Sequence, residues 1–335
     1  MRGLYVLNTN TNRNPEIFAT IGLAGVVITN LGWGDCEPEQ GKYDWTALDA
    51  AFAQVAAQPA LKVSLDLSAG MRAPGWVKSL PGVPTVTVDI NTRPHGAASS
   101  TTLPCAWSAP YVAAYTAFLE AAHAHLAATT MLPKVTAIRN GLFAGLDSEM
   151  EILWTDAAGP VTANAQAWAA AGFRPGVVVA ANIAFIGTLQ AMWPGVTVIQ
   201  SCMAPKIMFP WVDENGNVLA DDNSTGNFAA MVAAAGDAYG MGVMFLDTSL
   251  STCPPDAAFT DAVPQAGCLV GFQTNAWGGS QGAMGGTHRD PTPGSAETLQ
   301  ETIENGATWA GYIEVHAADV LNWPAAIAGA AATLA

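Results

Sequence analysis

Short apolar runs alternate with longer amphipathic or alanine-rich stretches along the whole chain. The apolar runs have the length of strands, and the stretches between them have the length and periodicity of helices. The strand-like runs are Gly3–Asn8, Gly25–Asn30, Leu61–Leu67, Lys134–Asn140, Val196–Ser201, Gly242–Asp247, Cys268–Thr274 and Gly311–His316. The helical stretches include Trp45–Ala57, Ala109–Ala128, Ala163–Ala171, Asn227–Tyr239, Ser295–Trp309 and a last helix in Asn322–Ala335. Such alternation predicts a parallel α/β fold.

The number of strands favours a closed barrel. Eight strands with intervening helices are what a (β/α)8 TIM barrel needs. The alternative is an open doubly wound sheet, but no Gly-rich phosphate-binding loop follows the first run. A chain of 335 residues fits one α/β barrel, and no linker or shift in composition divides it. We therefore expect residues 1–335 to form a single (β/α)8-barrel catalytic domain.

Three connections are too long for a minimal barrel: Pro81–Pro110, Ala204–Gly226 and Leu250–Ala266. They follow the third, fifth and sixth strands and are rich in Pro, Gly, Asn, Asp, Ser and Thr. Loops that follow the strands of a barrel lie at its carboxyl face, where active sites are built. The sequence thus predicts a site at that face.

The negative charge of the chain argues against polyanionic partners. A formal net charge of −15 would repel nucleic acid and an anionic membrane surface, whereas an uncharged substrate such as a sugar meets no such repulsion. No stretch is read as long enough to span a bilayer, and the start of the chain lacks a signal-peptide apolar region. We expect a carbohydrate substrate, no nucleic acid and no membrane; localisation and oligomeric state stay open.

The segment after the second strand carries a family resemblance. Trp33–Trp45 reads WGDCEPEQGKYDW, and Leu48-Asp49, a strand and then Ala73–Val77 (APGWV) follow. This resembles the W-x-x-x-E-P-E-x-G-x-Y-D-W…L-D…P-x-W pattern of clan A glycoside hydrolases, most closely the family 42 beta-galactosidases, over about the first quarter of the chain. The resemblance implies a TIM barrel that hydrolyses glycosidic bonds.

Within this segment, the residues have a structural use of their own. Pro38 and Gly41 suit a tight loop, and Tyr43 and Trp45 can anchor it to the barrel rim. We expect Glu37, Tyr43 and Trp45 to brace the turn rather than to act on a substrate.

Glycoside hydrolysis needs one carboxylic acid as proton donor and a second carboxylate as nucleophile or base. The resemblance implies that the acid follows the fourth strand, in Thr136–Glu151, and we assign it to Glu149. Apolar neighbours such as Met150 would raise the pKa of this carboxyl group, because desolvation disfavours the charged form. Asp147 and Glu151 are rivals, better explained as surface acids. Ser148 stands where the clan usually has Asn, so the usual contact to the sugar 2-hydroxyl is in doubt.

The second carboxylate is harder to assign. The resemblance implies a Glu at the end of the seventh strand, where this chain has Gln273. Strand alternation places Glu314 inside the barrel, and a buried lone Glu is costly unless it is paired or functional. Glu314 is our second carboxylate and Asp247 its alternative. A salt bridge from Glu314 to an inward Arg139 is the competing, purely structural interpretation.

Several polar and aromatic residues follow strands and are candidates for substrate binding. An indole can pack on the apolar face of a sugar ring, and Asn275–His288 has the composition of a flexible flap. No metal ligand spacing and no cofactor motif is found, so we expect neither a metal nor a cofactor. The expected substrate-binding residues are Trp33, Asp66, Trp76, Asn140, Asp247, Gln273, Asn275, Trp277, Tyr312 and His316.

Together these features predict a metal-independent glycoside hydrolase acting on an oligo- or polysaccharide. The alternative is a catalytically silent barrel that binds carbohydrate or serves as a scaffold in a larger assembly, which Gln273 supports. A barrel lyase or isomerase would need a Lys base or metal ligands at strand ends, and these are absent from the sequence pattern. The sugar, its linkage, exo or endo action and the stereochemical outcome are left open.

Overall fold

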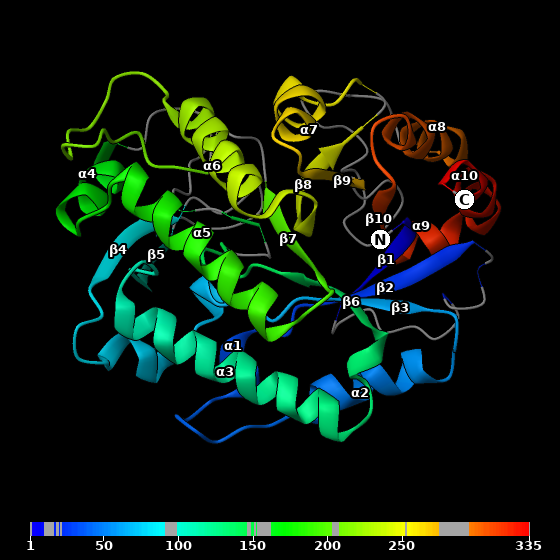
Figure 1. The fold of residues 1–335 in the computed structure, drawn as a ribbon, viewed down its shortest axis with the longest axis horizontal. Coiled ribbons are helices and arrows are strands. Elements are labelled where there is room, and N and C mark those ends of the chain that lie inside the picture. The colour runs from blue at the N-terminus through cyan, green and yellow to red at the C-terminus, as the bar shows by residue number, and fades with distance from the viewer. Residues whose placement is uncertain are drawn as a thin grey trace.

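The computed structural model describes residues 2–9, 17, 20, 22–90, 99–145, 149–150, 152, 162–202, 208–251, 253–274 and 295–334. Eight parallel strands close into a barrel in the order β1-β10-β9-β8-β7-β6-β3-β2 (Figure 1). They are β1 (Gly3–Thr9), β2 (Leu23–Thr29), β3 (Lys62–Leu65), β6 (Val135–Arg139), β7 (Thr197–Cys202), β8 (Val243–Leu250), β9 (Leu269–Thr274) and β10 (Tyr312–His316). The predicted TIM barrel is confirmed, and each predicted strand coincides with one of these.

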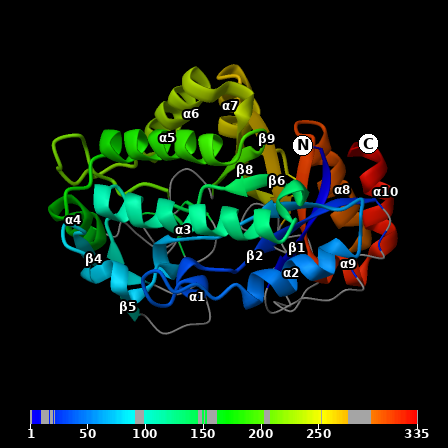
Figure 2. The same ribbon diagram turned by 60° about the horizontal axis from the view of Figure 1, so that its bottom comes forward.

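Helices follow most of the strands and form the outer layer. They are α1 (Trp33–Cys36), α2 (Thr46–Ala56), α3 (Ala109–Ala128), α4 (Thr162–Ala170), α5 (Pro175–Met192), α6 (Ser224–Tyr239), α7 (Val263–Gln265), α8 (Ala296–Ala307), α9 (Ala317–Asn322) and α10 (Pro324–Leu334). The long helices α3 and α5 run alongside each other in both ribbon views (Figure 2). Pro175 opens α5, where its fixed φ suits the first helical turn and its missing N–H costs nothing.

The helix α5 corrects one expectation. Its 18 residues are long and apolar enough to cross a membrane by length and composition alone, although no stretch of that kind is expected from the sequence. In the barrel, the helix buries Phe185, Ile186 and Leu189 and packs against β7, α3 and α6. We therefore interpret its apolar composition as that of a packing helix.

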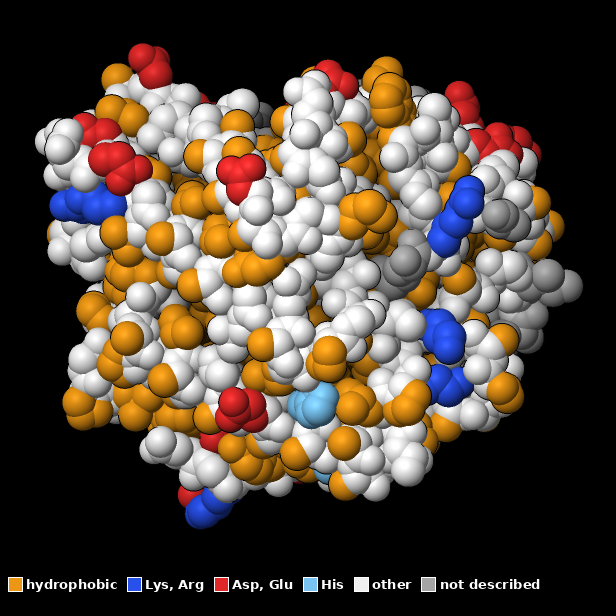
Figure 3. Space-filling model, viewed as in Figure 1, with side chains coloured by type: hydrophobic (Ala, Val, Ile, Leu, Met, Phe, Trp, Pro, Cys, Tyr) orange, Lys and Arg blue, Asp and Glu red, His pale blue; other side chains and the backbone are white. Residues whose placement is uncertain are grey.

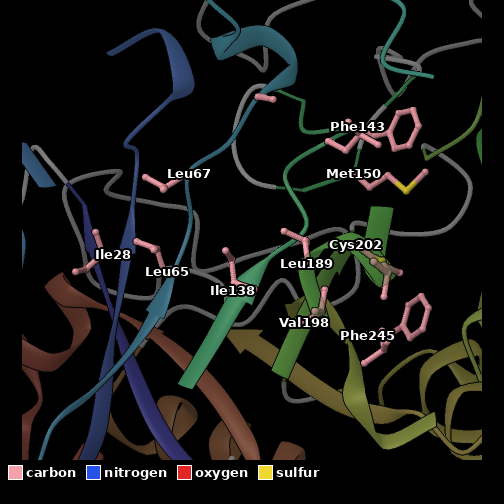
Figure 4. Close-up of a cluster of buried hydrophobic side chains, with 14 of the residues drawn as sticks. Ile28, Leu65, Leu67, Ile138, Phe143, Met150, Leu189, Val198, Cys202 and Phe245 are labelled. Carbon is pink, nitrogen blue, oxygen red and sulfur yellow. The ribbon is translucent and has the colours of Figure 1, made fainter. Parts of the chain in front are cut away.

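Alternation along the strands separates two hydrophobic clusters. The smaller one fills the inside of the barrel and consists of Tyr5, Leu7, Val27, Ala137, Ile199, Met244, Leu246 and Tyr312. The larger one lies between the strands and the helices, where Ile138, Val198 and Phe245 pack with Leu189 of α5 (Figure 4). A residue's parity on its strand therefore decides whether its side chain faces the interior of the barrel or the helices.

The long connections carry structure of their own. The connection after β3 contains an antiparallel hairpin of β4 (Thr85–Ile90) and β5 (Ser99–Pro104), which was not predicted. In it, the hydroxyl groups of Thr87 and Thr102 lie 2.9 Å apart across the two strands. The hairpin packs against α4, so it joins two loops that follow different strands. The face seen in Figure 3 shows few charged side chains, in keeping with a charged fraction of 12%.

Candidate active site at the carboxyl end of the barrel

The turn after β2 is braced as predicted. The Glu37 carboxylate accepts hydrogen bonds from the Trp33 indole N–H at 2.6 Å and from the backbone N–H of Gly41 at 2.7 Å. The rings of Tyr43 and Trp45 stack with their centroids 5.3 Å apart. Glu37 is buried, and both of its oxygens accept within its own loop. The bracing contacts predicted for Glu37, Tyr43 and Trp45 are confirmed.

Trp33 was expected to bind a sugar, and its position corrects that expectation. The side chain has no exposed surface. Its ring packs against Trp76, Tyr111 and Phe118, with centroids 5.6–5.9 Å away. Trp33 therefore belongs to the packing beneath the rim. Trp76 is half-buried and donates its indole N–H to the carbonyl of Glu37 at 3.2 Å, so part of this ring is left at the surface.

A buried ion pair lies inside the barrel. Arg139 Nη2 donates to Glu314 Oε2, and the Tyr312 hydroxyl donates to Glu314 Oε1 at 2.5 Å. Arg139 also donates from Nη1 to Ser201 Oγ at 3.3 Å. Glu314 is 0% exposed and Arg139 is 2% exposed. Burial, and then the negative charge of Glu314, raise the pKa of Tyr312, so the phenol keeps the proton that it donates.

Two further carboxylates act on the same guanidinium. Burial alone would lower the pKa of Arg139, but Glu314, Asp66 and Glu149 together raise it above its ordinary value. Asp66 has no exposed surface and accepts a hydrogen bond from the hydroxyl of Thr29 at 2.7 Å. Glu314 of β10 is therefore paired with this cation, while Asp66 after β3 and Glu149 after β6 act on it only through their charge. We call Arg139, Glu314, Asp66 and Glu149 the charged cluster.

Glu149 is held near the ends of β6 and β7 by its neighbours in the chain. The backbone N–H of Met150 donates to the carbonyl of Ser201, and the backbone N–H of Gly145 donates to the carbonyl of Glu149. Each of these hydrogen bonds is 2.9 Å long. Met150 is buried with Phe143 and with Cys202, the last residue of β7 (Figure 4). Glu149 itself is 7% exposed. Burial, and then Asp247 and Glu149, raise the pKa of Cys202, which places Glu149 within electrostatic reach of that strand end.

Two predicted site residues lie on the other side of the sheet. The Asn140 amide donates to Asn182 of α5 at 2.8 Å and to Gln200 at 3.0 Å, so it faces the helices. Asp247 has the same parity as the outward Phe245, and its carboxylate accepts from Ser249 N–H and hydroxyl at 2.9 and 2.6 Å. The expectation that Asn140 binds substrate is corrected by this parity, whereas the role of Asp247 in substrate binding or as the second carboxylate stays a prediction.

The remaining predicted site residues are Gln273, His316 and several that lie outside the described part of the chain. Gln273 pairs in register with Glu314 on the neighbouring strand. The His316 ring nitrogen Nε2 lies 3.0 Å from the carbonyl of Thr274, and the ring is partly exposed. Asn275 and Trp277 lie outside the described residues, as do Asp147, Ser148, Glu151 and the whole of the predicted flap Asn275–His288. Within the ranges given above, no group of three or more His, Cys, Asp and Glu side chains could hold a metal ion.

One rim feature was missed by the sequence analysis. Asn30, directly after β2, has a φ of 60°, a conformation in which Asn is the commonest residue after Gly. Its side-chain oxygen accepts from Arg72 Nη2 at 2.9 Å, and Arg72 Nη1 lies 3.7 Å from Asp35. The isolated Asn at a strand end was the only signal for this arrangement. The pair lies directly after β2, at the carboxyl end of the barrel.

Comparison with known proteins agrees with this architecture. The sequence profile of glycoside hydrolase family 42, beta-galactosidase, matches residues 6–132, which is less than half of the chain. Curated protein sequences give no match.

Solved structures resemble nearly the whole chain. The catalytic domain of a beta-amylase from Paenibacillus polymyxa has a TM-score of 0.57 and 11% identity, covering 93% of this chain and 91% of the other. A family 10 endo-beta-1,4-xylanase from Gloeophyllum trabeum has a TM-score of 0.55 and 12% identity, covering 100% and 96%.

A beta-galactosidase from Halorubrum lacusprofundi has a TM-score of 0.56 and 14% identity, covering 94% of this chain and 52% of the other. The chain thus spans about half the length of that enzyme. At such identities the structural likeness concerns the fold alone. The chain is a TIM barrel that shares its architecture with these glycosidases, and its first 132 residues include a segment similar to family 42 beta-galactosidases.

Proposed function

We propose that this barrel is a glycoside hydrolase in which Glu149 donates the proton and Glu314 is the second carboxylate. The observation that carries the proposal is that both carboxylates act electrostatically on one guanidinium, that of Arg139, at the carboxyl end of the barrel. Active sites of TIM barrels lie at this end. The partial match to a beta-galactosidase family supports the same reaction class.

The surroundings of the two groups suit different roles. Glu314 accepts hydrogen bonds from the Arg139 guanidinium and the Tyr312 phenol, and its carboxylate is the candidate nucleophile or base. Glu149 is buried at the ends of β6 and β7 and is the candidate proton donor. In this scheme, Glu149 protonates the leaving oxygen while Glu314 attacks the anomeric carbon or activates a water. Tyr312 and Gln273 flank Glu314 and would orient it.

A specific observation favours a second candidate function. Glu314 and Asp66 have no exposed surface, and Gln273 stands where a seventh-strand Glu is expected. An ion pair that is fully buried in this way is equally compatible with a barrel that binds carbohydrate without cleaving it. The two candidates differ in one measurable property, which is turnover.

The test is hydrolysis of a panel of aryl glycosides by the wild type and by Glu149→Gln, Glu314→Gln and Glu301→Gln. Glu301 is an exposed residue of α8 and serves as the matched control. We expect Glu149→Gln and Glu314→Gln to lower kcat by roughly 10²–10⁴-fold, as loss of acid–base catalysis does, and Glu301→Gln to leave kcat unchanged. Calorimetry of each variant establishes that it is folded at the assay temperature.

Substrates with a good leaving group distinguish a catalytic acid from a residue that is only structural. A dinitrophenolate leaves without being protonated, so dinitrophenyl glycosides should restore most of the activity of Glu149→Gln but not of Glu314→Gln. Equal losses on both kinds of substrate would contradict the role of Glu149. If the wild type hydrolyses none of the panel but binds sugars in calorimetric titrations, the non-catalytic function is the correct one.

A further inference from the structure

We propose that three buried amide side chains outside the barrel, those of Asn140, Asn182 and Gln200, position the segment that carries Glu149. We call these three residues the amide triad. The inference rests on the proposed function in that it treats Glu149 as the proton donor. It adds three positioning residues that lie on the helix side of the sheet and act on the reaction only through the position of Glu149.

The amide triad joins the ends of two strands to a helix. The Asn140 amide donates to Asn182 of α5 at 2.8 Å and to Gln200 of β7 at 3.0 Å, and the Asn182 amide also donates to Gln200 at 3.0 Å. The three side chains are 0–2% exposed. The other buried residues of α5 are apolar, so Asn182 is a polar group in a packing face and depends on these partners. A buried network that is paired in this way fixes the elements that it joins in one arrangement.

Asn140 connects the triad to the beginning of the segment. Its side-chain oxygen accepts a hydrogen bond from the backbone N–H of Leu142 at 3.3 Å. Two residues further along, Ala144 pairs with Met150, the residue that follows Glu149. The turn that leads from β6 towards Glu149 is therefore built on the side chain of Asn140.

Gln200 connects the triad to the other end of the segment. Its amide donates to the carbonyl of Ser201 at 3.4 Å, and the same carbonyl accepts from the backbone N–H of Met150 at 2.9 Å. Met150 also pairs with Cys202, the last residue of β7. The amide triad therefore holds residues that precede Glu149 as well as the residue that follows it.

The triad acts on one of the two candidate carboxylates and not on the other. Glu314 faces the interior of the barrel, where it is bound by Arg139 and Tyr312. A proton donor must lie within hydrogen-bond reach of the leaving oxygen. A displacement of about 1 Å can lower the rate by about 10²-fold. Loss of the triad should therefore weaken proton donation by Glu149 and leave the role of Glu314 unchanged.

Hydrogen exchange of single backbone amides measures the positioning directly. The variant Asn182→Leu keeps the volume of the side chain and removes its hydrogen bonds, and Ile186→Val, one turn along the same buried face of α5, is the matched control. We expect the amides of Leu142 and Met150 to exchange about tenfold faster in Asn182→Leu, which is the effect of one lost hydrogen bond on local opening. The control should exchange both amides as the wild type does.

Unchanged exchange at both amides in Asn182→Leu would overturn the inference. If this variant does not fold, Asn182→Ala takes its place, because the smaller side chain leaves room for water at the amide groups of Asn140 and Gln200.

Kinetics relate the positioning to the reaction. On phenyl glycosides, whose leaving group needs a proton, we expect Asn182→Leu to lower kcat about tenfold or more with KM unchanged. On dinitrophenyl glycosides, kcat should change by less than about twofold, because this leaving group departs without a proton. Ile186→Val should keep the wild-type rates on both substrates.

The two readouts separate the inference from the proposed function. Equal losses of kcat on both substrates would show that Asn182 has only a structural role and would overturn the inference. If the wild type hydrolyses no glycoside, the proposed function is rejected. The exchange of Leu142 and Met150 then still decides whether the amide triad positions the segment.

Discussion

Arg139 determines the chemistry of the barrel interior at the scale of single residues. Its guanidinium is bonded to Glu314 and Ser201 and lies within the field of two further carboxylates. Removal of one partner from a buried pair leaves an uncompensated charge, whereas replacement of both partners by apolar residues leaves none. Stability and catalysis can therefore be separated at this pair.

We expect Arg139→Met to lower the free energy of unfolding by about 3–5 kcal/mol, because it leaves Glu314 buried without its cation. The double variant Arg139→Met/Glu314→Leu should recover most of this loss, since no lone charge remains. Its hydrolytic activity should nevertheless be abolished. Urea unfolding and aryl glycoside assays measure the two effects, and a stable double variant that still turns over would exclude Glu314 from catalysis.

The residue-level predictions succeeded where parity decides the outcome. Alternation correctly placed Glu314 inside the barrel, where it pairs with Arg139, while its neighbours Ile313 and Val315 pack against the helices. Trp33 and Asn140 were predicted to bind substrate because they lie at the ends of strands, and alternation was not used for them. Position after a strand indicates the correct end of the barrel but not the direction of the side chain, which depends on the helices packed there.

At the scale of elements, a close contact joins the loops that follow two strands. Gly70, after β3, has a φ of +54°, and a Cβ at this position would lie 1.7 Å from the carbonyl oxygen of Ala144. Ala144 is five residues before Glu149 and pairs with Met150. The position of Glu149 therefore depends on the absence of a side chain at residue 70.

We expect Gly70→Ala to lower both stability, by about 1–3 kcal/mol, and kcat, because either the strained φ or the displaced loop must be accommodated. Gly75→Ala is the matched control, since a Cβ there meets nothing within 4 Å. Thermal unfolding and initial rates of both variants measure the effect. An active Gly70→Ala enzyme with unchanged kcat would show that the loop position does not matter for turnover.

Elements were predicted well wherever their pattern was periodic. All eight barrel strands and the boundaries of α3 follow from apolar runs and helix propensity. The helix α5 was missed because its exposed positions are also uncharged, so that no polar face alternates with the buried one. The hairpin of β4 and β5 was missed because its Thr- and Ser-rich strands have the composition of a loop.

At the scale of the whole molecule, burial of thiols couples stability to alkaline pH. Burial raises the pKa of Cys36 from 9.0 to about 12, and that of Cys105 and Cys268 to about 11. Above about pH 9 the unfolded chain loses these protons while the folded chain retains them. Stability is therefore complete below pH 9 and falls as the pH rises towards 11–12.

The midpoint of urea unfolding should accordingly stay level from pH 7 to 9 and decrease between pH 9 and 11. The variant Cys36→Ala/Cys105→Ala/Cys268→Ala should show a flatter decrease, since three of the thiols with a raised pKa are gone and Cys202 and the buried tyrosines remain. Measurement of both proteins across this range tests the linkage. Identical slopes for the two proteins would show that these thiols do not titrate differently in the folded and unfolded chains.

Closure of the barrel by β1 and β10 has a consequence for synthesis of the chain. The first strand pairs on one side with the second and on the other with the last, whose residues are more than three hundred positions away. Until the ribosome has released residue 316, an open edge of β1 remains available to other chains. The interior of the barrel is therefore complete only after β10 has been synthesised, and chaperones that bind the chain before then would favour correct closure over aggregation.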